Sequence, residues 1–266
     1  MVRDVLRRFT RAYIRLLRAE RPELSPSRAE LLAWALQSIL GSPSRYPVRL
    51  SPTDLNEVVL GASLAVCAVQ PAEDGGPVER VESGLQPASR RERLLLGAMR
   101  LFAEKGYQET GMNDIGAIAG VTGPSLYVHF DSKAALLEAV VERGTHLLWG
   151  ALDAALRAHT DPWSALGEVV AGYVELSRGW SGMRLPSGEP SVDETGRGRQ
   201  REYVAEWVAL VLDGRRGIDP AVARTLVNTA LPVIDDLCRT PHLIDASFDG
   251  NVTAIAMAIL GSEPAD

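Results

Sequence analysis

The sequence predicts an all-α fold, and three observations support this prediction. Leu, Ala, Val and Arg dominate the 266 residues, whereas the aromatic side chains that strands favour make up only 6%. Apolar residues recur at helical spacing, for example at Leu94, Leu95, Ala98, Leu101 and Phe102. Glycines and prolines stand between such segments and predict turns. We therefore expect a series of amphipathic helices.

The composition excludes several classes of protein. Hydrophobic residues are 46% and charged residues 23%, a balance that is typical of a globular protein with a core. No apolar run reaches the roughly 18 residues that span a bilayer, and the N-terminus lacks the apolar segment of a secretory signal. Cys67 and Cys238 stand far apart in apolar surroundings, so we expect reduced thiols and a cytoplasmic protein without a membrane partner.

No arrangement of residues predicts catalysis or metal binding. The four histidines have no nucleophile or carboxylate pair beside them, and neither a glycine-rich phosphate loop nor a zinc-ligand spacing is present. We expect a protein that is not an enzyme and that needs no cofactor.

Residues 71–88 divide the chain, because they are rich in Pro, Gly, Ser and charge and lack apolar periodicity. They predict a linker after an N-terminal helical segment, 1–70. A shift of the chain by 194 positions lays 1–66 on 195–260 without a gap and pairs Pro26 with Pro220 and Arg21 with Arg215. A duplication explains this match, as does the shared composition of two amphipathic Leu/Ala/Arg segments. In both copies we expect the third helix, at about 53–67 and 247–260, to be buried nearly all round.

Residues 89–105 predict a helix that is capped by Ser89, with Glu92 completing a capping box, and that ends at Gly106. A second helix is expected to begin at Asn113 and to stop at Gly120.

The next turn predicts a third, short helix that opens at Thr122, with Pro124 in its first turn. We expect Ile115, Ile118 and Ala119 of the second helix, and Leu126, Val128 and Phe130 after the turn, to face the core. Two short helices that are joined by a glycine turn predict a helix-turn-helix.

The run FAEKGYQET…NDIGAIAGVTGPSLYVHFDSKAALLEAV closely resembles the DNA-binding domain of the TetR family of transcription regulators. The resemblance covers about 89–145 and implies that the third helix enters the major groove of an operator. The residues that it implies at the DNA are Thr122, Gly123, Pro124, Ser125, Tyr127, His129, Lys133 and Asn113. The chain departs from the family at Gly116, where alanine is usual, and at Gly111–Met112, where a Ser or Thr often contacts phosphate.

The resemblance further implies a TetR-like DNA-binding domain at 89–135 and a helical effector-binding and dimerisation domain at 136–266, as in a ligand-responsive repressor. The stretch RQREYVAEWVALVL is similar to regulators that respond to lipid or acyl-CoA-like ligands. The residues that could line a pocket, or simply form core, are Tyr173, Trp180, Met183, Tyr203 and Trp207.

Two questions stay open at the level of the sequence. The net charge is −6, and acidic residues balance basic ones over 89–145, so a helical interaction protein that keeps the fold without specific DNA binding is an alternative. The segment 1–66 is either the remainder of a second domain of this kind or packs on 195–260 within one chain. The segment 195–260 accordingly pairs either with a second copy of the chain, in a homodimer, or with 1–66 of the same chain, in a pseudo-dimer.

Overall fold

The computed structural model describes residues 2–72, 76, 87–121, 126–179 and 194–265, and every regular element in these ranges is a helix. The α-helices are α1 (Val2–Glu20), α2 (Pro26–Gly41), α3 (Pro52–Ala68), α4 (Arg90–Lys105), α5 (Met112–Ala119), α7 (Lys133–Ala158), α8 (Pro162–Gly179), α9 (Glu194–Gly214), α10 (Pro220–Cys238) and α11 (Phe248–Gly261). Two 3₁₀ turns, η1 (Ser42–Arg45) and η2 (Pro241–Leu243), follow α2 and α10. None of the described helices has the length and apolar character needed to cross a membrane.

The chain forms two compact units. The larger unit comprises Met1–Val78, Ala154–Ser177 and Val204–Asp266, and the smaller unit comprises Glu79–Asp153 and Arg178–Tyr203. These units divide the chain differently from the four consecutive segments that the sequence suggested, because the N-terminal helices and the C-terminal helices share one core. The helix α7 passes from the smaller unit into the larger one after Asp153.

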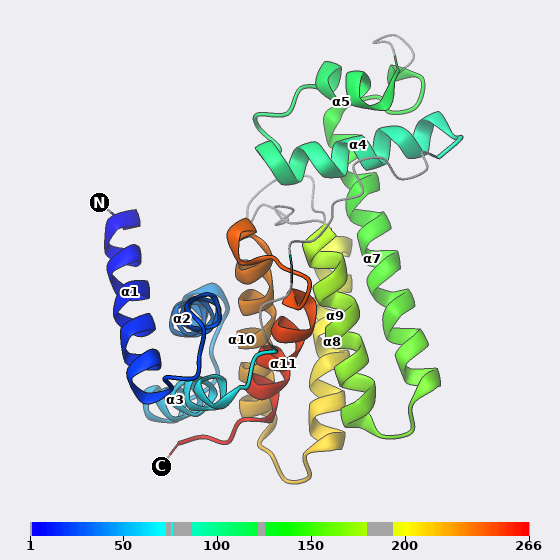
Figure 1. Cartoon of the computed structure of the whole chain (residues 1–266). Coiled ribbons are helices and arrows are strands. Elements are labelled where there is room, and N and C mark those ends of the chain that lie inside the picture. The colour runs from blue at the N-terminus through cyan, green and yellow to red at the C-terminus, as the bar shows by residue number, and fades with distance from the viewer. Residues whose placement is uncertain (1, 73–75, 77–86, 122–125, 180–193, 266) are drawn as a thin grey trace. The chain divides into compact units, whose positions relative to one another are not determined.

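In the larger unit, α2 is buried on nearly all of its faces. Leu31, Leu32, Ala33 and Ala35 are at most 1% exposed, although they point in different directions around the helix. The reason is its position, since α2 packs against α1 on one side and against α10 on the other (Figure 1).

The helices α3 and α11, which were both expected to be buried nearly all round, differ in burial. α11 buries Val252, Ile255 and Ile259 completely, as the sequence predicted. α3 was expected to be buried nearly all round, but Leu60 and Leu64 on it are 50% and 57% exposed. That expectation was wrong for α3 because the helix has packing neighbours on one side only.

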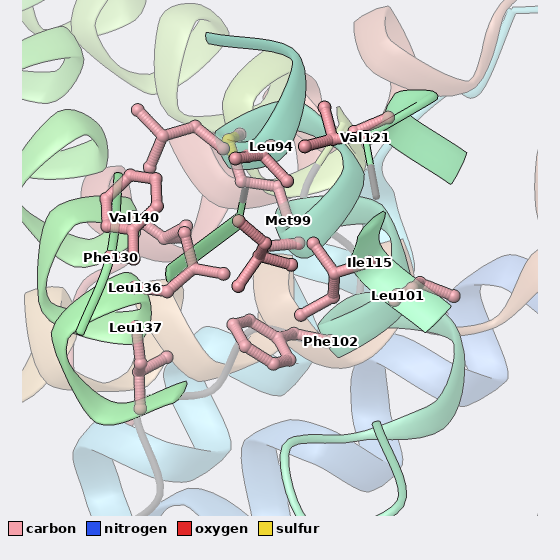
Figure 2. Packing of buried hydrophobic residues seen from close by; sticks show 14 residues of the cluster. Leu94, Met99, Leu101, Phe102, Ile115, Val121, Phe130, Leu136, Leu137 and Val140 are labelled. Atoms are coloured by element: carbon pink, nitrogen blue, oxygen red, sulfur yellow. The ribbon is translucent and has the colours of Figure 1, made fainter. Parts of the chain in front are cut away.

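The smaller unit has its own hydrophobic core, to which α4, α5, the segment 126–130 and α7 all contribute. Figure 2 shows Leu94 and Phe102 of α4 converging with Ile115 of α5 and Leu136 of α7. This core fixes the helices that carry the candidate site.

Candidate nucleic-acid interface

The turn between α4 and α5 is closed by a glycine and a buried hydroxyl. Gly106 ends α4 with φ = 83°, a left-handed value that other residues rarely adopt. Thr110 is 1% exposed, and its hydroxyl donates to the carbonyl oxygen of Gly106 at 2.8 Å. Thr110 was not predicted from the sequence, because no local pattern shows that its hydroxyl returns to the end of the preceding helix.

Lys133, a predicted phosphate contact, holds the same turn. Its ammonium nitrogen donates to the carbonyl oxygens of Tyr107 at 2.9 Å and of Thr110 at 3.1 Å. It also lies 4.4 Å from the centre of the Tyr107 ring. In this arrangement the charge of Lys133 is used inside the unit, and a direct phosphate contact would require these bonds to break.

The start of α5 differs in detail from the expectation. Gly111 is the N-cap, and the carboxylate of Asp114 accepts a hydrogen bond from the Gly111 N–H at 3.2 Å. Asn113, predicted as a cap or a phosphate contact, does not cap the helix but lies exposed in its first turn. On the opposite side of α5, Ile115 is completely buried as predicted, whereas Ile118 is 49% exposed and was wrongly assigned to the core.

The turn after α5 gives a physical reason for glycine at position 116. Gly120 ends the helix in the left-handed conformation, at φ = 63°, and the chain folds back so that the Val121 N–H donates to the Gly116 carbonyl at 2.8 Å. A Cβ atom on Gly116 would lie 2.8 Å from the Val121 carbonyl oxygen, closer than real Cβ contacts. The absence of a side chain at Gly116 therefore allows the close approach of the turn.

Residues 126–130 bring buried and exposed side chains next to each other. Leu126 and Phe130 are 1% and 5% exposed and belong to the core, whereas Tyr127 is 53% exposed. Val128, which the sequence assigned to the core, is 80% exposed, and that prediction was wrong. The physical reason is the helical spacing, in which positions four apart share a face and the positions between them point elsewhere. His129 is half-buried, and its backbone N–H donates to the Leu126 carbonyl.

The predicted DNA-contacting residues Thr122, Gly123, Pro124 and Ser125 lie outside the described residues. The described part of the candidate interface therefore consists of the exposed side of α5 and the exposed positions that follow the turn.

Arginines on α4 border this surface. The guanidinium carbon of Arg91 lies 5.1 Å from the centre of the Phe130 ring, and the side chain is 51% exposed. Ser89 precedes α4 as predicted, but its side chain makes no capping hydrogen bond. Glu92, the expected partner in a capping box, instead forms an ion pair with Arg143 of α7. A partner 51 residues away is invisible to a local sequence pattern.

The candidate pocket residues that the structure describes are packed side chains. In the larger unit, Trp207 is fully buried and its ring lies 5.6 Å from that of Tyr173, whose hydroxyl donates to the Asp235 carboxylate at 3.1 Å. In the smaller unit, Tyr203 is 5% exposed and packs at 5.8 Å on Trp149. Trp180 and Met183 lie outside the described residues.

A helix that ends in a tight glycine turn, with Tyr127 and Val128 exposed beyond that turn and α4 and α7 packed in the same core, is the arrangement expected of a helix-turn-helix nucleic-acid-binding domain. Residues 94–140 match the family model described as bacterial regulatory proteins, tetR family. Over this segment, the resemblance to the tetR family that the sequence predicted is confirmed.

Two curated relatives match about a third of the chain. The transcriptional activator FasR of Mycolicibacterium smegmatis is 38% identical over 87 residues, which are 33% of this chain and 40% of that protein. The transcriptional repressor KstR2 of the same species is 40% identical over 81 residues, 30% of this chain and 40% of that protein. The chain thus spans about two fifths of the length of these relatives.

Solved structures of regulators share the fold over a longer stretch. The ketosteroid regulator KstR2 of Mycobacterium tuberculosis matches with a TM-score of 0.55 and 20% identity, over 66% of this chain and 95% of that one. The regulator PfmR of Thermus thermophilus matches with a TM-score of 0.55 and 23% identity, over 66% of this chain and 98% of that one. The all-α, TetR-like fold is therefore confirmed, and about a third of this chain lies outside each match.

Proposed function

We propose that this protein is a cytoplasmic DNA-binding transcription regulator, acting as a repressor, that reads an operator with the helix-turn-helix over about 111–130. The observation that carries the proposal is the arrangement around Tyr127. This tyrosine is 53% exposed directly after the turn, while Leu126 and Phe130 anchor the same segment in the core. A segment that is anchored in the core and exposes a side chain with a polar group is suited to insertion into a groove.

The physical roles follow from this placement. The Tyr127 hydroxyl is available to donate to a backbone phosphate, and such contacts set the register of a protein on DNA. Arg91 supplies positive charge beside Phe130, although the chain as a whole is acidic, and DNA binding depends on such local charge. Lys133 contributes indirectly, by holding the turn that precedes α5.

The test is binding of labelled DNA from upstream of the protein's own gene, measured by fluorescence anisotropy at physiological salt. Y127F removes the hydroxyl alone and Y127A removes the ring as well. Because a hydrogen bond to a charged group contributes roughly 1.5–3 kcal/mol, we expect affinity to fall about tenfold or more in both variants.

L64A is the control, since Leu64 is 57% exposed on α3 in the other unit and should leave affinity unchanged. Unchanged affinity in Y127F and Y127A, or no specific binding by the unsubstituted protein, would favour the alternative of a helical interaction protein. Transcription from the same promoter, measured with and without the protein, separates a repressor from an activator.

We also propose that a small-molecule effector of the lipid or acyl-CoA-like class releases the DNA by binding among the C-terminal helices. Support comes from the aromatic pair Tyr173–Trp207 among the C-terminal helices, in which the tyrosine hydroxyl donates to the partly exposed carboxylate of Asp235. A ligand shifts a conformational equilibrium only as far as it prefers one state. A thermal-shift screen with fatty acids and acyl-CoA thioesters, followed by anisotropy with the hits, would reject this class if no compound both stabilises the protein and releases DNA.

A further inference from the structure

The helices α1, α2 and α3 follow one another as α9, α10 and α11 do, and the central helices α2 and α10 begin alike. α2 begins at Pro26 and α10 at Pro220, positions that are equivalent at an offset of 220 − 26 = 194. Each proline follows an N-cap whose side chain accepts a backbone N–H from three residues further on, at Ser25 and at Asp219. The same capping arrangement, an N-cap side chain followed by a proline, therefore begins both central helices.

Equivalent arginines make equivalent long-range contacts in the two copies. The guanidinium of Arg21 donates to the carbonyl oxygens of Cys67 and Val69, both at 2.7 Å. The guanidinium of Arg215 donates to the carbonyl oxygen of Leu260 at 2.8 Å and to the carboxylate of Glu263 at 2.6 Å. In both copies an arginine before the second helix thus holds the end of the third. Shared composition alone does not account for this match.

The two copies pack on each other as matching pairs, α2 on α10 and α3 on α11 (Figure 1). Where α2 meets α10, the Ser38 hydroxyl donates to the Pro232 carbonyl oxygen at 3.4 Å. These positions are equivalent, because 232 − 38 = 194. A residue meets its own equivalent only near the axis of a two-fold arrangement.

The segments after the third helices cross over in the same reciprocal way. The Ala72 N–H donates to the side-chain oxygen of Asn251 at 2.7 Å, and the Ala265 N–H donates to the Glu57 carbonyl at 3.0 Å. Glu57 and Asn251 are equivalent, since 251 − 57 = 194. Each copy therefore uses its trailing segment to bind the third helix of the other, as two subunits do in an isologous interface.

The seam between the copies is a true interior. Arg28 is only 4% exposed and forms an ion pair at 2.8 Å with Asp245. The hydroxyls of Ser42 and Thr229, both buried, lie 3.2 Å apart. Because α2 and α3 cover these faces of α10 and α11, a second chain cannot bind there without displacing them.

We propose that α1–α3 form an internal partner, which occupies on α10 and α11 the surface that a second copy would otherwise cover. The chain is then a pseudo-dimer through this surface, with one DNA-binding domain for two sets of pairing helices. The pairing does not depend on DNA binding, so the two proposals can fail separately.

The copies differ where α8 packs. α8 covers α9 through the contact of Tyr173 with Trp207, and Leu210 on α9 is 8% exposed. Its equivalent on α1, Leu16, is 64% exposed, because the described chain provides no counterpart of α8 there. The internal partner thus supplies the pairing helices alone.

Disulfide trapping in the full chain tests this pairing. In a background of C67S and C238A, S42C and T229C are combined in one chain, and separately the two single variants are mixed in equal amounts. After oxidation, we expect an intrachain bond in the double variant, seen by mass spectrometry, and no covalent dimer in the mixture. Circular dichroism verifies that each variant folds.

A covalent dimer in the mixture would show that the helices pair between chains, and would overturn the proposal. No bond in a folded double variant would overturn it as well. If that variant does not fold, S38C with D236C replaces it, since these side-chain oxygens lie 2.6 Å apart across the same seam. For this pair too, an interchain bond in the mixture, or no bond in the folded double variant, would overturn the proposal.

Discussion

At the scale of single residues, the ammonium group of Lys133 stabilises the turn between α4 and α5. Lys133→Met keeps the length of the side chain and removes the charge that binds the carbonyls of Tyr107 and Thr110. Because hydrogen bonds to charged groups contribute roughly 1.5–3 kcal/mol, we expect the free energy of unfolding to fall by about that amount. Urea denaturation, followed by circular dichroism, measures it.

The chain offers a matched control, because Lys105 is its only other lysine. Lys105 is exposed at the end of α4, so K105M should change stability by less than about 0.5 kcal/mol. Equal stability of the two variants would contradict the bracing role of Lys133. In DNA binding, K133M should leave the salt dependence unchanged, since a lost phosphate contact would reduce the slope by about one.

A glycine inside α5 leads to a second prediction. Alanine normally stabilises a helix interior by about 1 kcal/mol over glycine, but at Gly116 the new Cβ would lie 2.8 Å from the Val121 carbonyl oxygen. The neighbouring atom is backbone and cannot rotate away, so we expect G116A to lower the melting temperature. G150A is the control, because Gly150 in α7 has no atom within 4 Å of its Cβ position and should become more stable. A rise in melting temperature in both variants would show that the turn adapts.

Sequence patterns predicted what local spacing determines. Leu126 and Phe130 are four residues apart and both are buried, and the glycine turn at Gly120 lies where the pattern placed it. The patterns were wrong at Val128, where an alternating assignment placed an exposed side chain in the core. They could not predict the carbonyl partners of Lys133, because a long flexible side chain finds them only after the turn has folded.

At the scale of helices, the C-terminal segment at 263–265 packs closely against α3. Gly61 lies so close to the Glu263 carbonyl that a Cβ there would stand 1.8 Å from its oxygen. G61A must therefore displace this segment and break the bond from the Ala265 N–H to the Glu57 carbonyl. Since overpacking usually costs about 1–3 kcal/mol, we expect a loss of stability in that range.

Hydrogen exchange locates this effect. In G61A, the Ala265 amide should exchange faster, while amides in the smaller unit should keep their protection. G41A is the matched control, because Gly41 at the end of α2 has φ = −83° and no atom within 4 Å of its Cβ position. Unchanged protection of Ala265 in G61A would mean that the segment does not pack on α3.

At the scale of the whole molecule, the proposed pairing of α1–α3 with the C-terminal helices would determine how many DNA-binding domains act together. If α1–α3 are an internal partner, each chain forms the paired arrangement by itself and brings one helix-turn-helix to it, where a dimer of two chains would bring two. Binding of a two-fold symmetric operator normally uses two such domains at a fixed spacing. We therefore expect the full chain to occupy a single half-site, with a footprint of about one helical turn of DNA.

Removal of residues 2–70 tests this link between pairing and function. The truncated chain exposes the faces of α10 and α11 that α2 and α3 cover, and newly exposed apolar side chains on these faces favour association. We expect a dimer in which α10 and α11 pair with those of a second copy, with twice the mass of the truncated chain by light scattering. Two DNA-binding domains would then act together, so affinity for a two-half-site operator should rise relative to the full chain. A folded, monomeric truncated chain would mean that α10 and α11 do not need the covering helices, and that α1–α3 serve another purpose.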